Sequence, residues 1–331
     1  METICPAAGR PVARRSRATL AALLLLCIPA LASGQKYPER VIRYVVTDQP
    51  GSNIDALARI VSERLSEQFG QPVVVDNRAG AGGNIGAEIG ARAPADGHTL
   101  VQLASTHAAN ASLYRKLPYD LLRDFTPVSQ LASGPSVVVV PASSPLRSIG
   151  DLVRAAKEKP GSIQYASAGT GTCTFLSAEL FKRQAAVDLM HVAYKGGAPA
   201  LTSVLTGETG VYFSPLAPAL PQIRQGRLRA LAVTSPKPLQ VLPDQPTVSD
   251  AGVPGYQFSC WYGLFVPAGT PAPIVSTLHG AVVSMMGNAA VRKRLEDLGF
   301  LPVGDRPDQF AAYVRAEVKS ARELVRGIEP Q

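Results

Sequence analysis

Residues 41–60, VIRYVVTDQPGSNIDALARI, decide the fold. The apolar residues 41–46 predict a buried strand, residues 47–53 a turn-rich loop, and the remainder an amphipathic helix that begins near Asn53 or Asp55. Either side chain can cap the first turn, and the helix dipole adds partial positive charge there. A loop that leads from a first strand to a helix N-terminus is a ready site for an anion. The alternative is an ordinary capped helix that binds nothing.

The chain begins with a segment typical of secretory signals. Four arginines within residues 10–17 precede an apolar run at residues 20–31, and Ala30-Leu31-Ala32 offers small residues for cleavage. We therefore expect a signal peptide, residues 1–32, and a soluble, exported mature protein, with a retained anchor as the alternative. Cleavage leaves 29 basic and 24 acidic residues, which lowers the formal net charge from +8 to +5. The basic residues are scattered and do not alternate with aromatic residues, so no nucleic-acid partner is predicted.

Two cysteines, Cys173 and Cys260, remain in the mature chain. In an oxidising compartment they can pair, but two cysteines so far apart in the sequence do not make a disulfide framework. Two unpaired residues near loops are the alternative, and the sequence leaves both open.

Strands and helices alternate in two successive blocks. In the first block, strands at residues 72–76 and 99–104 follow the opening unit with a small-residue helix at 85–92 between them, which predicts a parallel sheet with right-handed crossovers. A connecting segment at 113–125 then leads to a short strand at 137–140. The second block repeats the architecture, with elements expected at residues 149–159, 163–166, 172–181, 189–193, 199–206, 211–213, 218–225 and 229–234.

The chain then returns to its first block. Residues 255–266, GYQFSCWYGLFV, alternate well enough to form a long strand. The helices expected after it have no strand between them and lie at residues 274–286, 289–298 and 307–325.

This order predicts two α/β lobes joined by two crossing strands, at residues 137–140 and 264–266. The predicted first lobe is discontinuous, residues 35–135 plus 262–331, and residues 136–261 form the second lobe. Loops at the carboxyl ends of both sheets would line a central cleft between the lobes.

The sequence does not match the motifs of the common cofactor and hydrolase sites. The third glycine of a dinucleotide fingerprint would fall at Ile85 in the first glycine-rich loop and at Thr174 in the second, and neither loop has the Lys-Ser/Thr ending of a P-loop. The four histidines lack metal-ligand spacing, and there is no Gly-x-Ser-x-Gly elbow. We therefore expect no cofactor, no metal and no catalytic residue, with an enzyme assembled from distant residues as the alternative.

Small and hydroxyl-bearing residues collect where the expected strands end. Backbone N–H groups and hydroxyls at helix N-termini suit a carboxylate, because they satisfy its lone pairs without a buried countercharge. Local capping explains each group taken alone, but their shared placement at one cleft favours binding. The groups are Ser52 and Asn53, residues 105–107, residues 167–172, and Ser214.

Segments along nearly the whole mature chain resemble one known family. They include VVVDNRAGAGGNIGAE at 73–88, YASAGTGT at 165–172, HVAYKGGAPALT at 191–202 and WYGLFVPAGTPAPIV at 261–275. In this order they are similar to the tripartite tricarboxylate transporter substrate-binding receptors of the Bug (Bordetella uptake gene) type. The resemblance implies a monomeric, non-enzymatic protein with a two-lobed periplasmic-binding-protein-like (type II) fold. Such a protein closes on a small organic acid and delivers it to membrane permease subunits.

The resemblance also implies a ligand site, position by position. Such receptors build their pocket from the first strand-to-helix loop, the loop after the third strand and a Gly-x-Gly-Thr loop of the second lobe. The ligand-binding residues predicted here are Asp48, Ser52, Asn53, Asp55, Ser105, Thr106, His107, Ala168, Gly169, Thr170, Thr172, Tyr194, Lys195 and Ser214.

The first loop departs from the family pattern. That loop commonly reads Pro-Phe-Pro-Pro-Gly-Gly-Ser-Thr-Asp, whereas residues 47–55 here are TDQPGSNID, and Ser214-Pro215 stands where many members have Asp-Asn. If Asp48 faces the cleft, it would repel a simple dianion and favour a ligand with a hydroxyl, an amine or a ring nitrogen. Alternatively Asp48 faces solvent or caps a turn.

A periplasmic sensor that feeds a signalling kinase is the alternative to a transport receptor, because both functions need the same ligand-binding clamp.

Overall fold

The computed structural model describes residues 1–5, 9 and 37–328. Most of the expected signal peptide, including the apolar run at 20–31, lies outside the described residues. The chain divides into two units, Met1–Glu39 and Arg40–Gln331. The described residues of the first unit form no helix or strand, and every element named below belongs to the second unit.

The first sheet is built around β1 (Ile42–Val46). β1 lies between β2 (Val73–Asn77) and β3 (Thr99–Ala104), and both pairings are parallel. Four of the five β1 residues are buried, as expected for a parallel strand covered on both faces. β9 (Ser259–Pro267) runs antiparallel beside β3. The parallel order predicted for the first block is therefore confirmed.

The second sheet repeats this arrangement around β5 (Gln164–Ser167). β5 lies between β6 (Met190–Ala193) and β7 (Val211–Pro215), and both pairings are again parallel. β8 (Leu228–Val233) pairs antiparallel with β4 (Phe125–Pro141). The loops that leave β1 and β5 therefore occupy corresponding positions in the two sheets.

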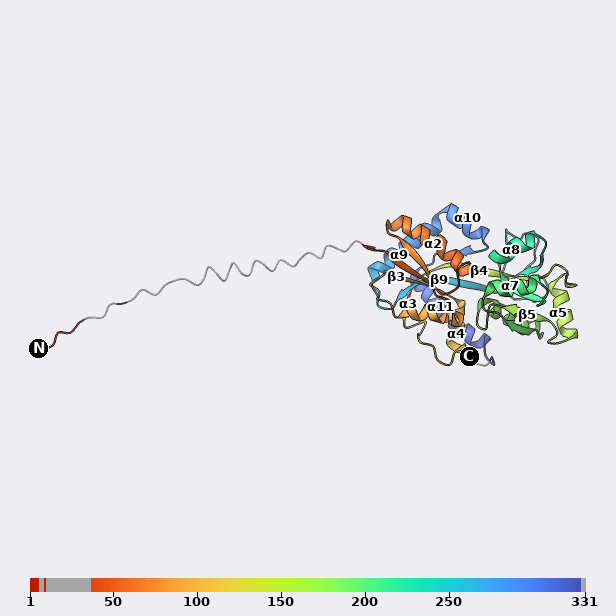
Figure 1. The fold of residues 1–331 in the computed structure, drawn as a ribbon, viewed down its shortest axis with the longest axis horizontal. Helices are drawn as coiled ribbons and strands as arrows, with labels where there is room; N and C mark the ends of the chain where they lie inside the picture. Colours follow the sequence, from red (N-terminus) through yellow and green to blue (C-terminus); the bar gives the residue numbers. More distant parts are fainter. Residues whose placement is uncertain (6–8, 10–36, 329–331) are drawn as a thin grey trace. The chain divides into compact units, whose positions relative to one another are not determined.

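β4 joins the two sheets, and Figure 1 shows it running between the elements around β9 and those around α7 (Gly197–Leu205). It pairs with β9 as far as Pro135 and with β7 and β8 beyond that residue. The chain returns from the second sheet to the first beside this point. There the Phe258 N–H donates to the Thr234 carbonyl at 2.9 Å, and Ser259 pairs with Pro135. The two connections between the sheets therefore lie side by side.

β4 is much longer than the strand predicted at residues 137–140. Residues 137–140 pair inside the second sheet, so the chain crosses just before them. The preceding run FTPVSQLASGPS is rich in proline, serine and glycine and has no clean alternation, which is why the sequence did not predict a strand there. Two register shifts against β9 absorb this irregular pattern. β9 itself begins at Ser259, four residues later than predicted.

Helices cover both sheets. Among the described residues, no single helix is long and apolar enough to cross a membrane; α9 and α10 pass that test only as a pair, which is bent by 77°. The three helices predicted after the return strand are confirmed to within two residues at each end, as α9, α10 and α11. The helices are α2 (Asn53–Phe69), α3 (Asn84–Ala91), α4 (Ser105–Leu113), α5 (Ile149–Glu158), α6 (Cys173–Ala185), α7 (Gly197–Leu205), α8 (Leu216–Arg224), α9 (Ala272–Gly287), α10 (Ala289–Asp297) and α11 (Pro307–Leu324), with the 3-10 turn η1 (Ala81–Gly83) and the short strand β10 (Leu301–Pro302).

α4 was not predicted. Residues 105–107 were expected in a loop after the third strand, but they form the first turn of this helix. The helix sequence STHAANASL consists largely of small residues and has no apolar stripe, although six of its nine residues are buried. Packing against the rest of the protein, rather than amphipathic pattern, therefore stabilises α4.

Apolar side chains pack on both faces of the second sheet. In β4, Val138 and Val140 belong to one buried cluster and Val137 and Val139 to another, as the two-residue period of a strand requires. α11 contributes Phe310 to the cluster under the first sheet, and the residue after its end, Val325, joins a second-sheet cluster. This helix therefore packs against both halves of the molecule.

Candidate functional site

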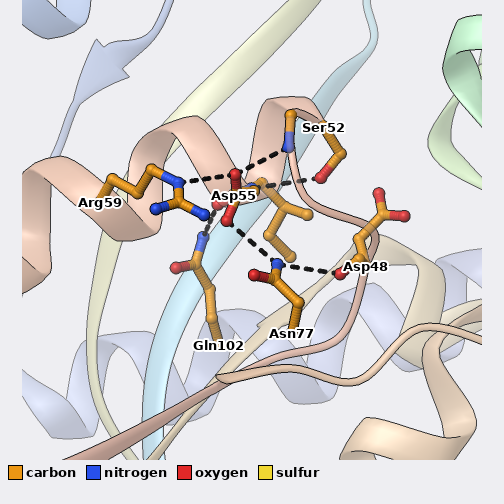
Figure 2. Close-up of polar contacts among 8 residues, drawn as sticks. Asp48, Ser52, Asp55, Arg59, Asn77 and Gln102 are labelled. Atoms are coloured by element: carbon orange, nitrogen blue, oxygen red, sulfur yellow. Dashed lines mark hydrogen bonds and ion pairs between the residues drawn. The ribbon is translucent and has the colours of Figure 1, made fainter. Parts of the chain in front are cut away.

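The loop after β1 is held by one buried carboxylate, that of Asp55 (Figure 2). It accepts hydrogen bonds from the Gly51 N–H at 2.8 Å, the Arg59 guanidinium at 2.9 Å and the Asn77 amide at 3.0 Å. Burial alone would raise the pKa of Asp55, but these bonds outweigh it and lower the pKa. Ser52 caps α2 by accepting the Asp55 N–H at 3.3 Å. Both of these predicted site residues therefore hold the loop from within.

Asn53, the first residue of α2, connects the loop to β9. Its amide nitrogen donates to the Tyr262 hydroxyl at 2.9 Å, and its side-chain oxygen is buried without a hydrogen-bond partner. The Tyr262 ring lies so close to Gly134 in β4 that a Cβ added there would be 2.7 Å from the ring. Sequence reasoning missed Tyr262; its place in the aromatic return strand beside the predicted crossing was the available signal.

Asp48 lies in the same loop and is partly buried. Its Oδ1 accepts the Gln49 N–H at 2.7 Å, so one carboxylate oxygen is bonded within the loop. Burial and the neighbouring charge of Asp55 raise the pKa of Asp48, and hydrogen bonds within the loop offset only part of this. Burial, together with the charge of Asp48, also raises the pKa values of the Tyr212 and Tyr262 hydroxyls. Asp48 is therefore within electrostatic reach of β7 and β9, one strand from each sheet.

Ser105, Thr106 and His107 open α4 and have different surroundings. Ser105 Oγ accepts the Trp261 N–H at 2.9 Å, and His107 Nδ1 accepts the Ala104 N–H at 3.1 Å. Burial lowers the pKa of His107 to about 4, which keeps the imidazole neutral at neutral pH. The Thr106 hydroxyl instead approaches the second sheet, with its Oγ1 3.8 Å from the sulfur of Cys173.

The loop after β5, residues 168–172, is held by neutral hydroxyl groups. Thr174 Oγ1 accepts the Ala168 N–H at 2.9 Å, and Thr172 Oγ1 donates to the Gly169 carbonyl at 2.6 Å. Gly169 has a φ of 124°, a conformation that favours glycine. Part of the hydrogen-bonding capacity of this loop is therefore used to maintain its own shape.

A disulfide joins Cys173, the first residue of α6, to Cys260 in β9. The structure thereby decides between the two alternatives that the sequence left open. The bond fastens the end of the second loop to the strand that carries Tyr262.

Three further predicted residues lie beyond β6 and in β7. The Tyr194 N–H donates to the Ser167 carbonyl at 2.9 Å, while the Tyr194 hydroxyl is buried without a hydrogen-bond partner. Lys195 is exposed. Ser214 is fully buried, and its hydroxyl donates to the Pro215 carbonyl at 2.9 Å, so it serves the local backbone.

The predicted loops of the two sheets come together in the structure. Gly171 is so close to α4 that an added Cβ would lie 2.8 Å from Leu113 Cδ1 and 3.0 Å from Asn110 Oδ1. A Cβ added at Gly196, after β6, would lie 3.8 Å from Gln49 Oε1 in the first loop. These contacts place the first loop and the C-terminal half of α4 against the two loops of the second sheet.

Other candidate sites are less well supported. In the described part of the chain, no group of three or more His, Cys, Asp or Glu side chains could hold a metal ion. A cavity of about 400 Å³ lies between α6 and the end of α11, and none of the predicted site residues lines it. Two of its basic side chains have local partners, Lys182 with Glu179 at 3.2 Å and Arg183 with the Glu323 carbonyl at 3.1 Å. The candidate site is therefore the region where the loops of the two sheets meet.

Comparisons with known proteins agree with one another. Residues 57–329 match the family described as tripartite tricarboxylate transporter family receptor. Protein BugT of Bordetella pertussis is 34% identical over 301 residues, which cover 90% of this chain and 92% of that protein. The solved structure of R. palustris Rpa4515 with adipate has a TM-score of 0.85 and 36% identity, over 89% of this chain and 100% of that one. MatC from Rhodopseudomonas palustris, with bound malate, has a TM-score of 0.80 and 33% identity, over 87% and 100%. These likenesses confirm the predicted two-lobed α/β fold.

Proposed function

We propose, on the premise that this chain belongs to the tripartite tricarboxylate transporter receptor family, that it captures a small carboxylate-containing organic acid in the periplasm and delivers it to a membrane permease. Among relatives with solved structures, BugD is a periplasmic binding protein, Rpa4515 holds adipate and MatC holds malate. The observation that carries the proposal is the meeting of polar loops from two sheets that are joined by paired connections.

In this proposal, residues 35–135 plus 262–331 form one lobe and residues 136–261 the other. The lobes would rotate about the neighbouring connections at Pro135 and Ser259, which pair with each other. A ligand that bonds to loops of both lobes gains all of its contacts only in the closed state, so binding shifts the population towards closure.

The second lobe supplies a group that suits a carboxylate. The Tyr194 hydroxyl is buried and has no hydrogen-bond partner, although such groups are costly to leave unpaired. A carboxylate oxygen would accept a hydrogen bond from it, and the Thr170 region at the neighbouring loop would complete the contact. The predicted site residues Tyr194 and Thr170 are therefore the positions we assign to the ligand's carboxylate end.

Thermal unfolding in the presence of organic acids tests capture. A panel of mono-, di- and aminocarboxylates should contain ligands that raise Tm as their concentration increases. A ligand present at about 100 times its Kd should add about 2.7 kcal/mol to the free energy of unfolding. Tyr194→Phe should weaken the best ligand by about ten-fold. Tyr313→Phe, at an exposed tyrosine of α11, is the matched control and should leave affinity unchanged. Stabilisation by sugars or cations but by no carboxylate would overturn the proposal.

Delivery needs a separate measurement in cells. Removal of the protein should abolish uptake of the radiolabelled ligand identified in vitro, and the Tyr194→Phe variant should restore only part of it. Uptake that does not depend on the protein would show that it binds the ligand for another purpose.

A further inference from the structure

We infer that the first loop selects ligands that carry a protonated nitrogen in addition to a carboxylate, and that Asp48 is the residue that pairs with this nitrogen. The inference rests on the proposed function, because it concerns the other end of the same ligand. It commits the site to amino acids and related zwitterions over simple dicarboxylates.

The first step is the direction of the Asp48 side chain. Figure 2 shows its carboxylate pointing away from Arg59 and Asn77, the donors that bind Asp55 in the same loop. It is instead close enough to the hydroxyls of Tyr212 and Tyr262 to act on both electrostatically. The next residue, Gln49, reaches the second sheet, because a Cβ added at Gly196 would lie 3.8 Å from its Oε1, so this part of the first loop lies at the junction where the loops meet.

The second step is the lack of a countercharge. Among the described residues, no ion pair involves Asp48, and the charged neighbour that acts on it, Asp55, is also acidic. Lys195, on the adjoining loop of the second lobe, is exposed and forms no ion pair with it in that part of the chain. A partly buried carboxylate without a cation is unfavourable, and a cationic ligand group would relieve this.

The third step is a second acceptor in the same loop. Asn53 uses its amide nitrogen to donate to Tyr262, which leaves its buried side-chain oxygen unpaired. An ammonium group has three donors and can serve Asp48 and Asn53 together, whereas a carboxylate has none to offer. The loop therefore presents acceptors, in contrast to the unpaired Tyr194 hydroxyl, which is a donor.

The resulting site has opposite chemistry at its two ends. A donor in the second lobe suits a carboxylate, and acceptors in the first loop suit a protonated nitrogen. A dianion such as malate or adipate would bring its second carboxylate towards Asp48 without a compensating charge, and like charges at short range disfavour binding.

Matched ligand pairs test this inference by calorimetry on the whole protein. Malate and aspartate differ only in a hydroxyl against an ammonium, and adipate and 6-aminohexanoate only in the group at one end. We expect the nitrogen-bearing member of at least one pair to bind on the order of ten-fold more tightly or better. Asp48→Asn should remove that preference, because the substituted amide can still accept the Gln49 N–H but carries no charge. Asp297→Asn, at an exposed ion pair of α10, should leave the preference intact.

The outcomes separate the two proposals. Tight binding of dicarboxylates with no preference for their nitrogen-bearing partners, unchanged in Asp48→Asn, would overturn the role of Asp48 while leaving the receptor function in place. Failure of every carboxylate, with or without nitrogen, to bind would overturn both.

Discussion

The two strand-to-helix loops that follow β1 and β5 occupy corresponding positions but are ordered by different chemistry. The first is organised by an ionised carboxylate, because Asp55 receives bonds from Gly51, Arg59 and Asn77. The second is organised by neutral hydroxyls and ends at a disulfide to Cys260. The first loop is thus held in place by bonds to a charged group, and the second loop by neutral hydrogen bonds and a covalent bond.

This difference predicts that each loop responds to a different condition. Acid should loosen the first loop, since protonation of the Asp55 carboxylate removes the charge that pairs with Arg59. Reduction should loosen the second loop, since only that loop is tied by a disulfide. The substitutions below test this division.

Removal of the disulfide should have the largest effect on stability. The bond closes a sequence separation of 87 residues, and a cross-link of that length stabilises the fold by about 3–4 kcal/mol by restricting the unfolded chain. The Cys173→Ser, Cys260→Ser double variant should lose about this much free energy of unfolding in urea at pH 7. A reductant should produce a similar loss in the parent protein and none in the double variant. A loss below about 1 kcal/mol would contradict a structural role for the bond.

Asp55→Asn should cost less, about 2 kcal/mol, because it weakens three hydrogen bonds to a charged group. Since the folded-state pKa of Asp55 lies below its ordinary value of 3.8, this stability is present above that value and is lost as the pH falls below it. The difference in unfolding free energy between parent and variant should therefore be full at pH 7 and shrink below about pH 4.

The exposed pair Lys293–Asp297, with an N–O distance of 2.8 Å, supplies the control for this measurement. Asp297→Asn should change stability by less than about 0.5 kcal/mol at any pH, because exposed ion pairs contribute little. An Asp55→Asn effect that was equally small, or that did not depend on pH, would show that the first loop is not held ionically.

The sequence predicted the sheets better than the connection between them. The strands around β1 and β5 are short apolar runs bounded by turn residues, and such runs carry a local signal. The first part of β4 carries no such signal, because its pairing is supplied by β9, more than 120 residues later in the chain. The local sequence of one strand does not reveal that it will pair with a strand so distant in the chain.

The candidate site shows the same limit at the level of side chains. Asn53 and Thr106 were predicted and lie on the surfaces that meet the second sheet or β9. Asp55 and His107 were predicted on the same grounds, yet local donors occupy them. Composition and position show that a polar residue ends a strand, but only the fold shows which partner it finds. The ligand-binding role of the predicted residues stays a prediction until binding is measured.

Of the substitutions in the two loops, Thr174→Val should have the smallest effect, and this effect should not depend on pH. Thr174 Oγ1 accepts the Ala168 N–H at 2.9 Å and lies 2.9 Å from the Thr172 hydroxyl, and its residue is buried. Valine keeps the shape but leaves the Ala168 N–H unpaired, which costs about 1 kcal/mol. Thr174→Ser, which retains the hydroxyl, is the matched control for the lost hydrogen bond. Urea unfolding of both variants at pH 7 and at about pH 3 should give the same gap at both values, since neither bond involves a group that titrates in this range. A gap that closed in acid, as expected for Asp55→Asn, would mean that both loops share one electrostatic network and that the contrast between them is false.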